Sequence, residues 1–193
     1  MNKSAKYEID MCNGPLVGKI IRFTIPLILT SVLQLLFNAA DIVVVGRFAG
    51  KEAMAAVGST GALINLIINV LMGLSIGTSV LVARYYGAND PERVSKAVHT
   101  SIAISVVGGV LIGVLGIVIC RPMLELMGTP EDVIDGAELY MRIYFAGFPV
   151  IALYNFGASV LRAVGDTKRP LYFLFIAGVV NVLLNLLCVI VLK

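Results

Sequence analysis

Residues 20–45 read IIRFTIPLILTSVLQLLFNAADIVVV, an apolar run longer than the roughly 20 residues that a membrane-spanning helix needs. Pro26 lies near its start and Asp41 near its end. Four polar side chains follow one another at spacings of four, four and three residues and therefore share one helix face: Thr30, Gln34, Asn38 and Asp41. A charged Asp in mid-helix costs roughly 2.5 to 3.5 kcal/mol on insertion scales, so it is expected to face a cavity or a partner. The stretch predicts a transmembrane helix with a functional polar face.

The composition predicts a membrane protein rather than a water-soluble domain. Of the 193 residues, 59% are hydrophobic and only 14% are charged. The net charge of +3 comes from basic residues scattered at the ends of apolar runs, which argues against a nucleic-acid partner. The three cysteines are widely spaced and fit neither a disulfide framework nor a zinc site.

Five apolar runs follow a polar N-terminal segment, residues 1–19. We expect an all-α polytopic transmembrane bundle of about five spans, at residues 20–45, 53–83, 97–120, 139–161 and 171–192. An N-terminus in the cytoplasm would place ten Lys and Arg residues on the inside and five on the outside, as the positive-inside rule favours. The predicted location is the cell (inner) membrane, with the lipid bilayer around the helices.

Several small residues inside the runs are interpreted as packing positions, where another helix can approach closely. They are Gly73 and Gly77 in the second run, and Gly108, Gly109, Gly113 and Gly116 in the third. The acidic segment 121–138 is expected to be a solvated connection, with no metal site.

Polar side chains also occur deep in the later runs. The fourth run carries Tyr140 and Asn155, and the fifth carries Asn181 and Asn185 on one face, four residues apart. Buried amides need hydrogen-bond partners, because unpaired donors and acceptors are costly in hydrocarbon. Phosphate loops, nucleophile elbows and zinc motifs are absent from the sequence, so we expect no enzyme activity. The pattern is typical of an ion-coupled transporter.

Ordered motifs make the chain resemble a known family. Pro26 precedes Asp41 by fifteen residues, and the motifs VGRFAG (45–50), AAVG (55–58), ARYYGA (83–88) and LRAVGDT (161–167) follow. Together they are similar to the multidrug and toxic compound extrusion (MATE) family, over Gly14 to Lys193. That family is built from two six-helix lobes, so the resemblance implies five helices of the N-terminal lobe. It also implies a partner, either the second lobe or a second chain.

The resemblance implies a secondary active antiporter that expels small lipophilic, often cationic compounds and is driven by protons or sodium, without another cofactor. The Asp of the first helix is implicated in ion coupling, and sodium at Asp41 is the one metal it suggests. Prokaryotic members often have an Asp where this chain has Asn185, and an amide cannot titrate, which leaves Asp41 as the sole proton acceptor. The implied site is Asp41, Gln34, Asn38, Tyr140, Asn155, Asn181 and Asn185, with Pro26 as hinge.

Two alternatives stay open at this point. A lipid-linked oligosaccharide flippase of the same superfamily would share the lobe architecture, but it would be expected to need cations in the cavity, and the deep positions hold neither Lys nor Arg. A non-transporting truncated membrane module is the other. The sequence leaves the substrate, the coupling ion and the oligomeric state undetermined.

Overall fold

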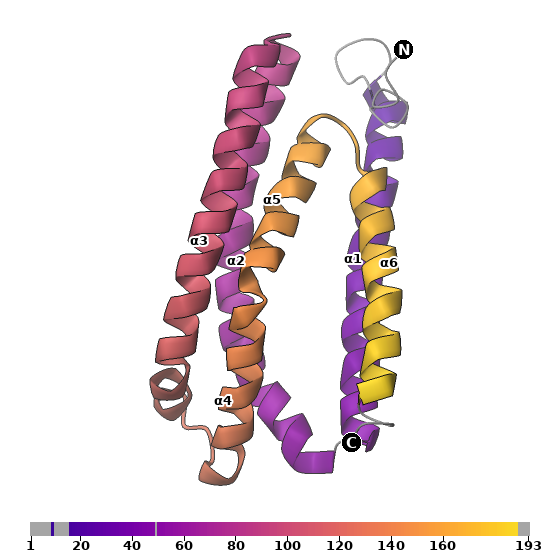
Figure 1. Ribbon diagram of the computed structural model, residues 1–193. Coiled ribbons are helices and arrows are strands. Elements are labelled where there is room, and N and C mark those ends of the chain that lie inside the picture. Colours follow the sequence, from indigo (N-terminus) through magenta and orange to yellow (C-terminus); the bar gives the residue numbers. More distant parts are fainter. Residues whose placement is uncertain (1–8, 10–15, 49, 189–193) are drawn as a thin grey trace.

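The computed structural model describes residue 9 and residues 16–48 and 50–188. Within these ranges the ordered elements are helices: α1 (Leu16–Phe48), α2 (Gly50–Gly87), α3 (Pro91–Leu126), α4 (Glu131–Ala146), α5 (Phe148–Ala163) and α6 (Lys168–Leu186) (Figure 1). Four of them are long and apolar enough to cross a membrane, and the bent pair α4–α5 makes a fifth if it counts as one span. The predicted all-α bundle of about five spans is confirmed. Most of the N-terminal segment 1–19 and the end of the fifth run lie outside the described residues.

The helices extend beyond the apolar runs, most clearly at segment 121–138. Helix α3 continues to Leu126 and α4 begins at Glu131, so the expected solvated connection is mostly helical. Ion pairs one helical turn apart lie in the last turns of α3 and inside α4, with Arg121 Nε 3.3 Å from Glu125 Oε1 and Arg142 Nη2 2.6 Å from Glu138 Oε1. Hydropathy marks where a helix leaves the hydrocarbon, whereas the helix itself ends where the backbone turns.

The fourth span is broken rather than continuous. Helices α4 and α5 meet at Gly147 with a bend of 49°, where the sequence predicted a single run over residues 139–161. Pro149 explains the break, because its ring nitrogen has no hydrogen to donate to the carbonyl one turn earlier. The Gly147 N–H is shared between the Ile143 and Tyr144 carbonyls, at 3.2 and 3.1 Å, and closes the end of α4.

A stripe of glycines on α3 lets the bent pair pack closely. A Cβ atom on Gly109 would lie 2.8 Å from Pro149 Cα, and one on Gly113 would lie 2.8 Å from the Phe145 carbonyl oxygen. One on Gly116 would overlap the Phe145 ring. The packing interpretation therefore holds for these three glycines. It is wrong for Gly73, Gly77 and Gly108 within the described residues, because a Cβ at any of them meets open space.

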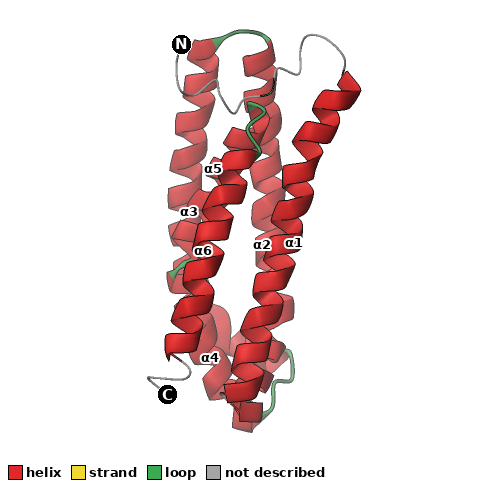
Figure 2. Cartoon of the chain, turned by 90° about the vertical axis from the view of Figure 1, so that its right-hand side faces the viewer, coloured by secondary structure: helices red, strands yellow, loops and turns green. Residues whose placement is uncertain are grey.

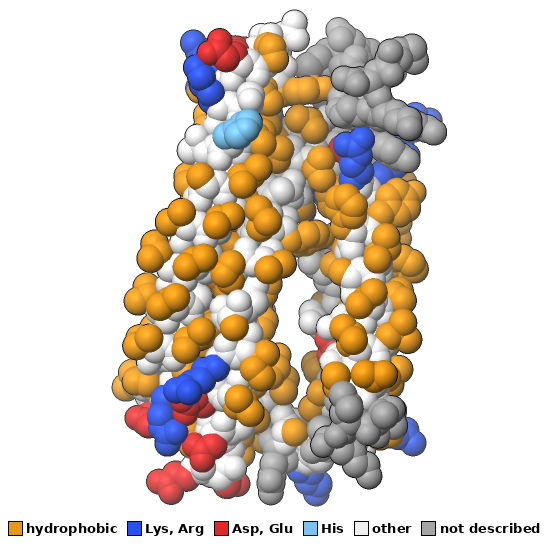
Figure 3. Space-filling view, viewed as in Figure 1, with side chains coloured by type: hydrophobic (Ala, Val, Ile, Leu, Met, Phe, Trp, Pro, Cys, Tyr) orange, Lys and Arg blue, Asp and Glu red, His pale blue; other side chains and the backbone are white. Residues whose placement is uncertain are grey.

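The buried core lies among α2, α3, α4 and α5, where Phe145, Phe148, Met141 and Leu124 are almost fully buried. Helices α1 and α6 form a separate pair that is joined to the rest mainly through α2 (Figure 1). Figure 2 shows this pair in front of the remaining helices. The outer surface is covered by apolar side chains, while charged groups gather at the two ends (Figure 3). This distribution is that of a bundle with lipid around its middle.

The adjacent glycines on α3 give a matched test of the packing. Alanine at either position gains the same intrinsic helix propensity. Gly109→Ala also forces a methyl group into the Pro149 backbone and is expected to lower the free energy of unfolding by about 1–3 kcal/mol. Gly108→Ala places its methyl group in open space and should leave stability unchanged or slightly higher. Unfolding in detergent micelles, followed by helical circular dichroism, measures both; equal stabilities would contradict the close packing.

Candidate functional site

Among the described residues, the side-chain hydrogen bond that spans the largest separation in sequence joins α1 to α6. Asn185 Nδ2 donates a hydrogen bond to Asp41 Oδ1 at 2.5 Å, and the same nitrogen lies 3.4 Å from Asn181 Oδ1. An amide NH₂ carries two hydrogens, so one nitrogen can serve both acceptors. Asp41 and Asn185 are partly buried, whereas Asn181 is exposed. A carboxylate and two amides from two helices thus form one small polar cluster, the Asp41–Asn185–Asn181 cluster.

The close approach of the two helices near this cluster depends on Gly178. A Cβ on Gly178 would overlap the ring of Phe37, which lies one turn before Asp41 on α1. Because glycine has no side chain, α6 can press its backbone against that ring, and Asn185 then reaches Asp41. The sequence places Asn181 and Asn185 on one face, but the glycine that brings that face to α1 lies outside the predicted site.

The electrostatic surroundings of Asp41 contain no paired cation. The salt bridges of the described residues lie near the ends of the bundle, and none of them includes Asp41. Among these residues no group of three or more His, Cys, Asp or Glu side chains could hold a metal ion. A hard monovalent cation at Asp41 would take its ligands from the carboxylate and from amide oxygens, which are the donor type that hard cations prefer.

The remaining predicted residues are placed differently. Tyr140 on α4 is 37% exposed, and it is close enough to Asp41 for an electrostatic interaction between the two side chains. Gln34 is partly buried and Asn38 is exposed, and within the described part of the chain neither side chain makes a hydrogen bond. Asn155 Nδ2 donates to the Ile151 carbonyl of its own helix at 2.9 Å. The structure therefore gathers Asp41, Asn181 and Asn185, places Tyr140 nearby, and leaves Asn155 occupied within α5.

Pro26, the predicted hinge, lies four turns before Asp41 in a helix that continues through it. The Thr30 hydroxyl donates to the Pro26 carbonyl oxygen at 2.7 Å, and both residues are buried. A proline removes one backbone hydrogen bond, and a Thr hydroxyl bonded one turn back favours a slight bend. At Pro26, α1 therefore lacks one backbone hydrogen bond of a regular helix.

Two polar contacts were missed by the sequence reasoning. Ser159 Oγ donates to Ser75 Oγ at 3.2 Å across α5 and α2, and Arg162 Nη2 donates to Ser159 Oγ at 3.1 Å. No pattern within one helix signals a contact between single serines of two helices.

At the opposite end of the bundle, Glu138 is buried and its carboxylate lies between Arg121 and Arg142, so it is not solvated as the acidic segment suggested. The spacing of Glu138 and Arg142 by four residues was the available signal.

Comparison with known proteins gives a consistent result. Residues 26–187 match the sequence model of the family described as MatE. The chain is 38% identical over 162 residues to the "Probable multidrug resistance protein YoeA" of Bacillus subtilis, covering 84% of this chain and 35% of that protein. It is 23% identical over 175 residues to the "FAD transporter" of Shewanella oneidensis, covering 91% of this chain and 38% of that protein.

Solved structures agree with the sequence relatives. The structure titled "Outward-facing conformation of a multidrug resistance MATE family transporter of the MOP superfamily" matches with a TM-score of 0.84 at 30% identity, covering 90% of this chain and 38% of that one. A MOP superfamily transporter from Pyrococcus furiosus, whose title reports a reversed polarity of the binding pocket, matches with a TM-score of 0.85 at 30% identity, covering 91% of this chain and 38% of that one. The chain spans less than two fifths of the length of these relatives.

The contact between Asp41 and Asn185 can be tested by a double-mutant cycle. Asn185→Leu leaves a partly buried carboxylate oxygen without its donor and is expected to lower the free energy of unfolding by about 1–3 kcal/mol. Asn69→Leu is the matched control, because Asn69 is exposed on α2. Asp41→Leu combined with Asn185→Leu should cost less than the sum of the single changes. Additivity within about 0.5 kcal/mol would contradict a direct contact.

Proposed function

Because the chain belongs to the MatE family of membrane transporters, we propose that it forms one lobe of a secondary active antiporter that expels small lipophilic, often cationic compounds. Protons or sodium ions drive the exchange. The observation that carries the proposal is the hydrogen bond from Asn185 to Asp41, which gives the one acidic residue of α1 and α6 a neutral partner and no cation. A carboxylate in that state has capacity left for a proton, a sodium ion or a cationic substrate.

The family membership and the apolar helices identify a multi-pass membrane protein. An N-terminus in the cytoplasm and a place in the cell (inner) membrane belong to the proposal, as does a second lobe or second chain that completes the transport path. Relatives named multidrug resistance proteins support the substrate class, since YoeA of Bacillus subtilis carries that name.

In the proposed cycle, Asp41 exchanges its ion against substrate. The ionised carboxylate attracts a cationic compound, and binding of a proton or sodium ion removes that attraction. The same neutralisation weakens the hydrogen bond that holds Asn185, and so loosens α6 from α1. An ion shifts a conformational equilibrium only by its difference in affinity for the two states. Loss of this helix contact supplies such a difference.

The amide at position 185 limits the exchange in this lobe. Asn185 donates a hydrogen bond but cannot release a proton at physiological pH, so Asp41 is the one group of the Asp41–Asn185–Asn181 cluster that changes charge. We infer that the lobe exchanges one positive charge per cycle. Pro26 lets α1 change its bend without breaking further backbone hydrogen bonds.

The role of Asp41 is tested by transport in everted membrane vesicles from cells that produce the protein. Asp41→Asn keeps the shape of the side chain but removes the charge, and should reduce ethidium uptake driven by a proton or sodium gradient by at least about tenfold. Asp132→Asn is the matched control, because Asp132 is exposed in the first turn of α4. Unchanged proton and sodium dependence in the Asp41 variant would refute the proposed coupling.

The hinge is tested separately. Pro26→Ala restores a backbone donor inside α1 and stiffens the helix, since proline in a helix interior costs about 3 kcal/mol relative to alanine. We expect slower ethidium transport together with a higher unfolding temperature. Ile28→Ala, which trims an exposed side chain two residues later, should leave the transport rate close to that of the parent. A Pro26→Ala variant that transports at the parental rate would exclude a hinge at this position.

A further inference from the structure

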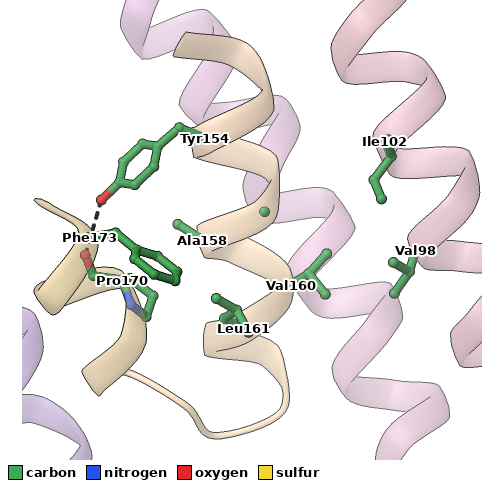
Figure 4. A pocket seen from close by; sticks show the side chains of 9 residues that line it. Val98, Ile102, Tyr154, Ala158, Val160, Leu161, Pro170 and Phe173 are labelled. Atoms are coloured by element: carbon green, nitrogen blue, oxygen red, sulfur yellow. Dashed lines mark hydrogen bonds between the residues drawn. The ribbon is translucent and has the colours of Figure 1, made fainter. Parts of the chain in front are cut away.

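An apolar pocket lies between α3, α5 and α6, at the end of the bundle where α5 ends and α6 begins (Figure 4). Its volume is about 380 Å³, within the range of roughly 300–1,000 Å³ that is typical of small-molecule sites. Helix α5 lines the base of the pocket with two small residues, Gly157 and Ala158, which leave space for a ligand. Val98 and Ile102 form the α3 wall, and Pro170 and Phe173 form the α6 wall. Within the described residues no Cα atom of α3 lies within 8 Å of a Cα atom of α6, so the pocket lies between two helices that do not pack closely.

No side chain that lines the pocket has a polar group available to bind a ligand. Tyr154 is the one polar side chain among the lining residues, and its hydroxyl donates to the Pro170 carbonyl oxygen at 3.3 Å. This bond, drawn in Figure 4, ties α5 to α6 and satisfies the hydroxyl. The pocket therefore suits a flexible hydrocarbon ligand and gives no hydrogen-bonding group for a polar one.

Basic residues lie just beyond the pocket, toward the same end of the bundle. Near the starts of α3 and α6 and the end of α5 there are five basic residues against three acidic ones, a local net charge of +2: Arg93, Lys96, Arg162, Lys168 and Arg169 against Asp90, Glu92 and Asp166. Figure 3 shows blue side chains over the starts of both helices. Lys96 precedes Val98 by two residues and Lys168 precedes Pro170 by two. Three of the five pair with the three acids, as Arg93 with Asp90, Lys96 with Glu92 and Arg169 with Asp166. Arg162 and Lys168 make no ion pair within the described residues, and they flank the turn from α5 to α6, next to the lining residues Leu161 and Pro170.

We propose that this pocket binds an acyl chain of an anionic membrane phospholipid, whose phosphate lies at the basic residues above it. A hydrocarbon groove below a cationic rim matches the two halves of such a lipid, because basic pockets between transmembrane helices attract anionic headgroups. The bound lipid bridges α3 and α6, whose backbones do not pack closely, and so links the α1–α6 pair to the rest of the bundle. This site is independent of Asp41 and of transport.

Native mass spectrometry of the purified full chain, titrated with palmitoyl-oleoyl phosphatidylglycerol or phosphatidylcholine, tests the proposal. Gly157→Leu fills the pocket, and a Cβ at Gly157 meets no atom within 4 Å, so the change is tolerated by the fold. We expect it to weaken phosphatidylglycerol binding by about tenfold. Gly77→Leu on α2 is the matched control, because its Cβ also meets nothing within 4 Å and Gly77 does not line the pocket, and it should keep the parental affinity.

The headgroup is tested by a second pair of variants. Lys168→Gln should weaken phosphatidylglycerol binding by about fivefold and leave phosphatidylcholine binding unchanged, since one basic residue near an anionic lipid is worth about 1 kcal/mol. Lys51→Gln, an exposed lysine at the start of α2, serves as the control and should change neither.

Several results would overturn the proposal. The proposal is wrong if the Gly157→Leu and Gly77→Leu chains bind phosphatidylglycerol equally well, or if the parent binds the two lipids equally well. It is also wrong if Gly157→Leu keeps its lipid affinity and instead loses ethidium binding or a dimer. If Gly157→Leu loses the helical circular dichroism signal, Ile102→Trp decides in its place, because it narrows the same pocket from α3 and should weaken phosphatidylglycerol binding about as much.

Discussion

A polar group inside a bilayer must find its partner within the protein, and this constraint governs the arrangement of α1 and α6. Asp41 accepts a hydrogen bond from Asn185, which lies 144 residues later in the chain. Hydrocarbon offers no water to replace that donor, so the contact holds the two helices in register. Gly178 makes it possible by letting the α6 backbone lie against Phe37. An ion that changes the charge of Asp41 acts directly on the contact between these helices.

The rest of the bundle is held mainly by close packing of its helices. The glycines at positions 109, 113 and 116 of α3 receive the kinked pair α4–α5, whose bend comes from Pro149. Phe145 and Phe148 then fill the centre of a tight four-helix core. The α1–α6 pair packs less closely against this core than the core helices pack against one another.

Charge and apolar surface divide the molecule along its length. The middle of the bundle presents exposed Leu, Ile and Val side chains, while the ion pairs lie near the ends. At one end, Glu138 is held between Arg121 and Arg142 and fastens α3 to α4. At the other end, Arg93, Lys96 and Arg169 also form ion pairs, while Arg162 and Lys168 lie at the turn from α5 to α6, beside the apolar pocket. Both ends thus contain ion pairs, but the second keeps two basic residues that make no ion pair within the described residues.

The sequence by itself determined the all-α membrane architecture, the family and the polar face of α1, because hydropathy and helical spacing act locally along the chain. It also placed Asn181 and Asn185 on one face. The resemblance placed both amides in one site with Asp41, but neither spacing nor hydropathy revealed that Asn185 itself donates to Asp41, that Asn155 bonds its own helix, or that Ser75 meets Ser159. Those outcomes depend on which helices lie side by side and how closely. Helix packing sets that distance through glycines and one proline whose neighbours are remote in sequence, and only the tertiary structure brings those neighbours together.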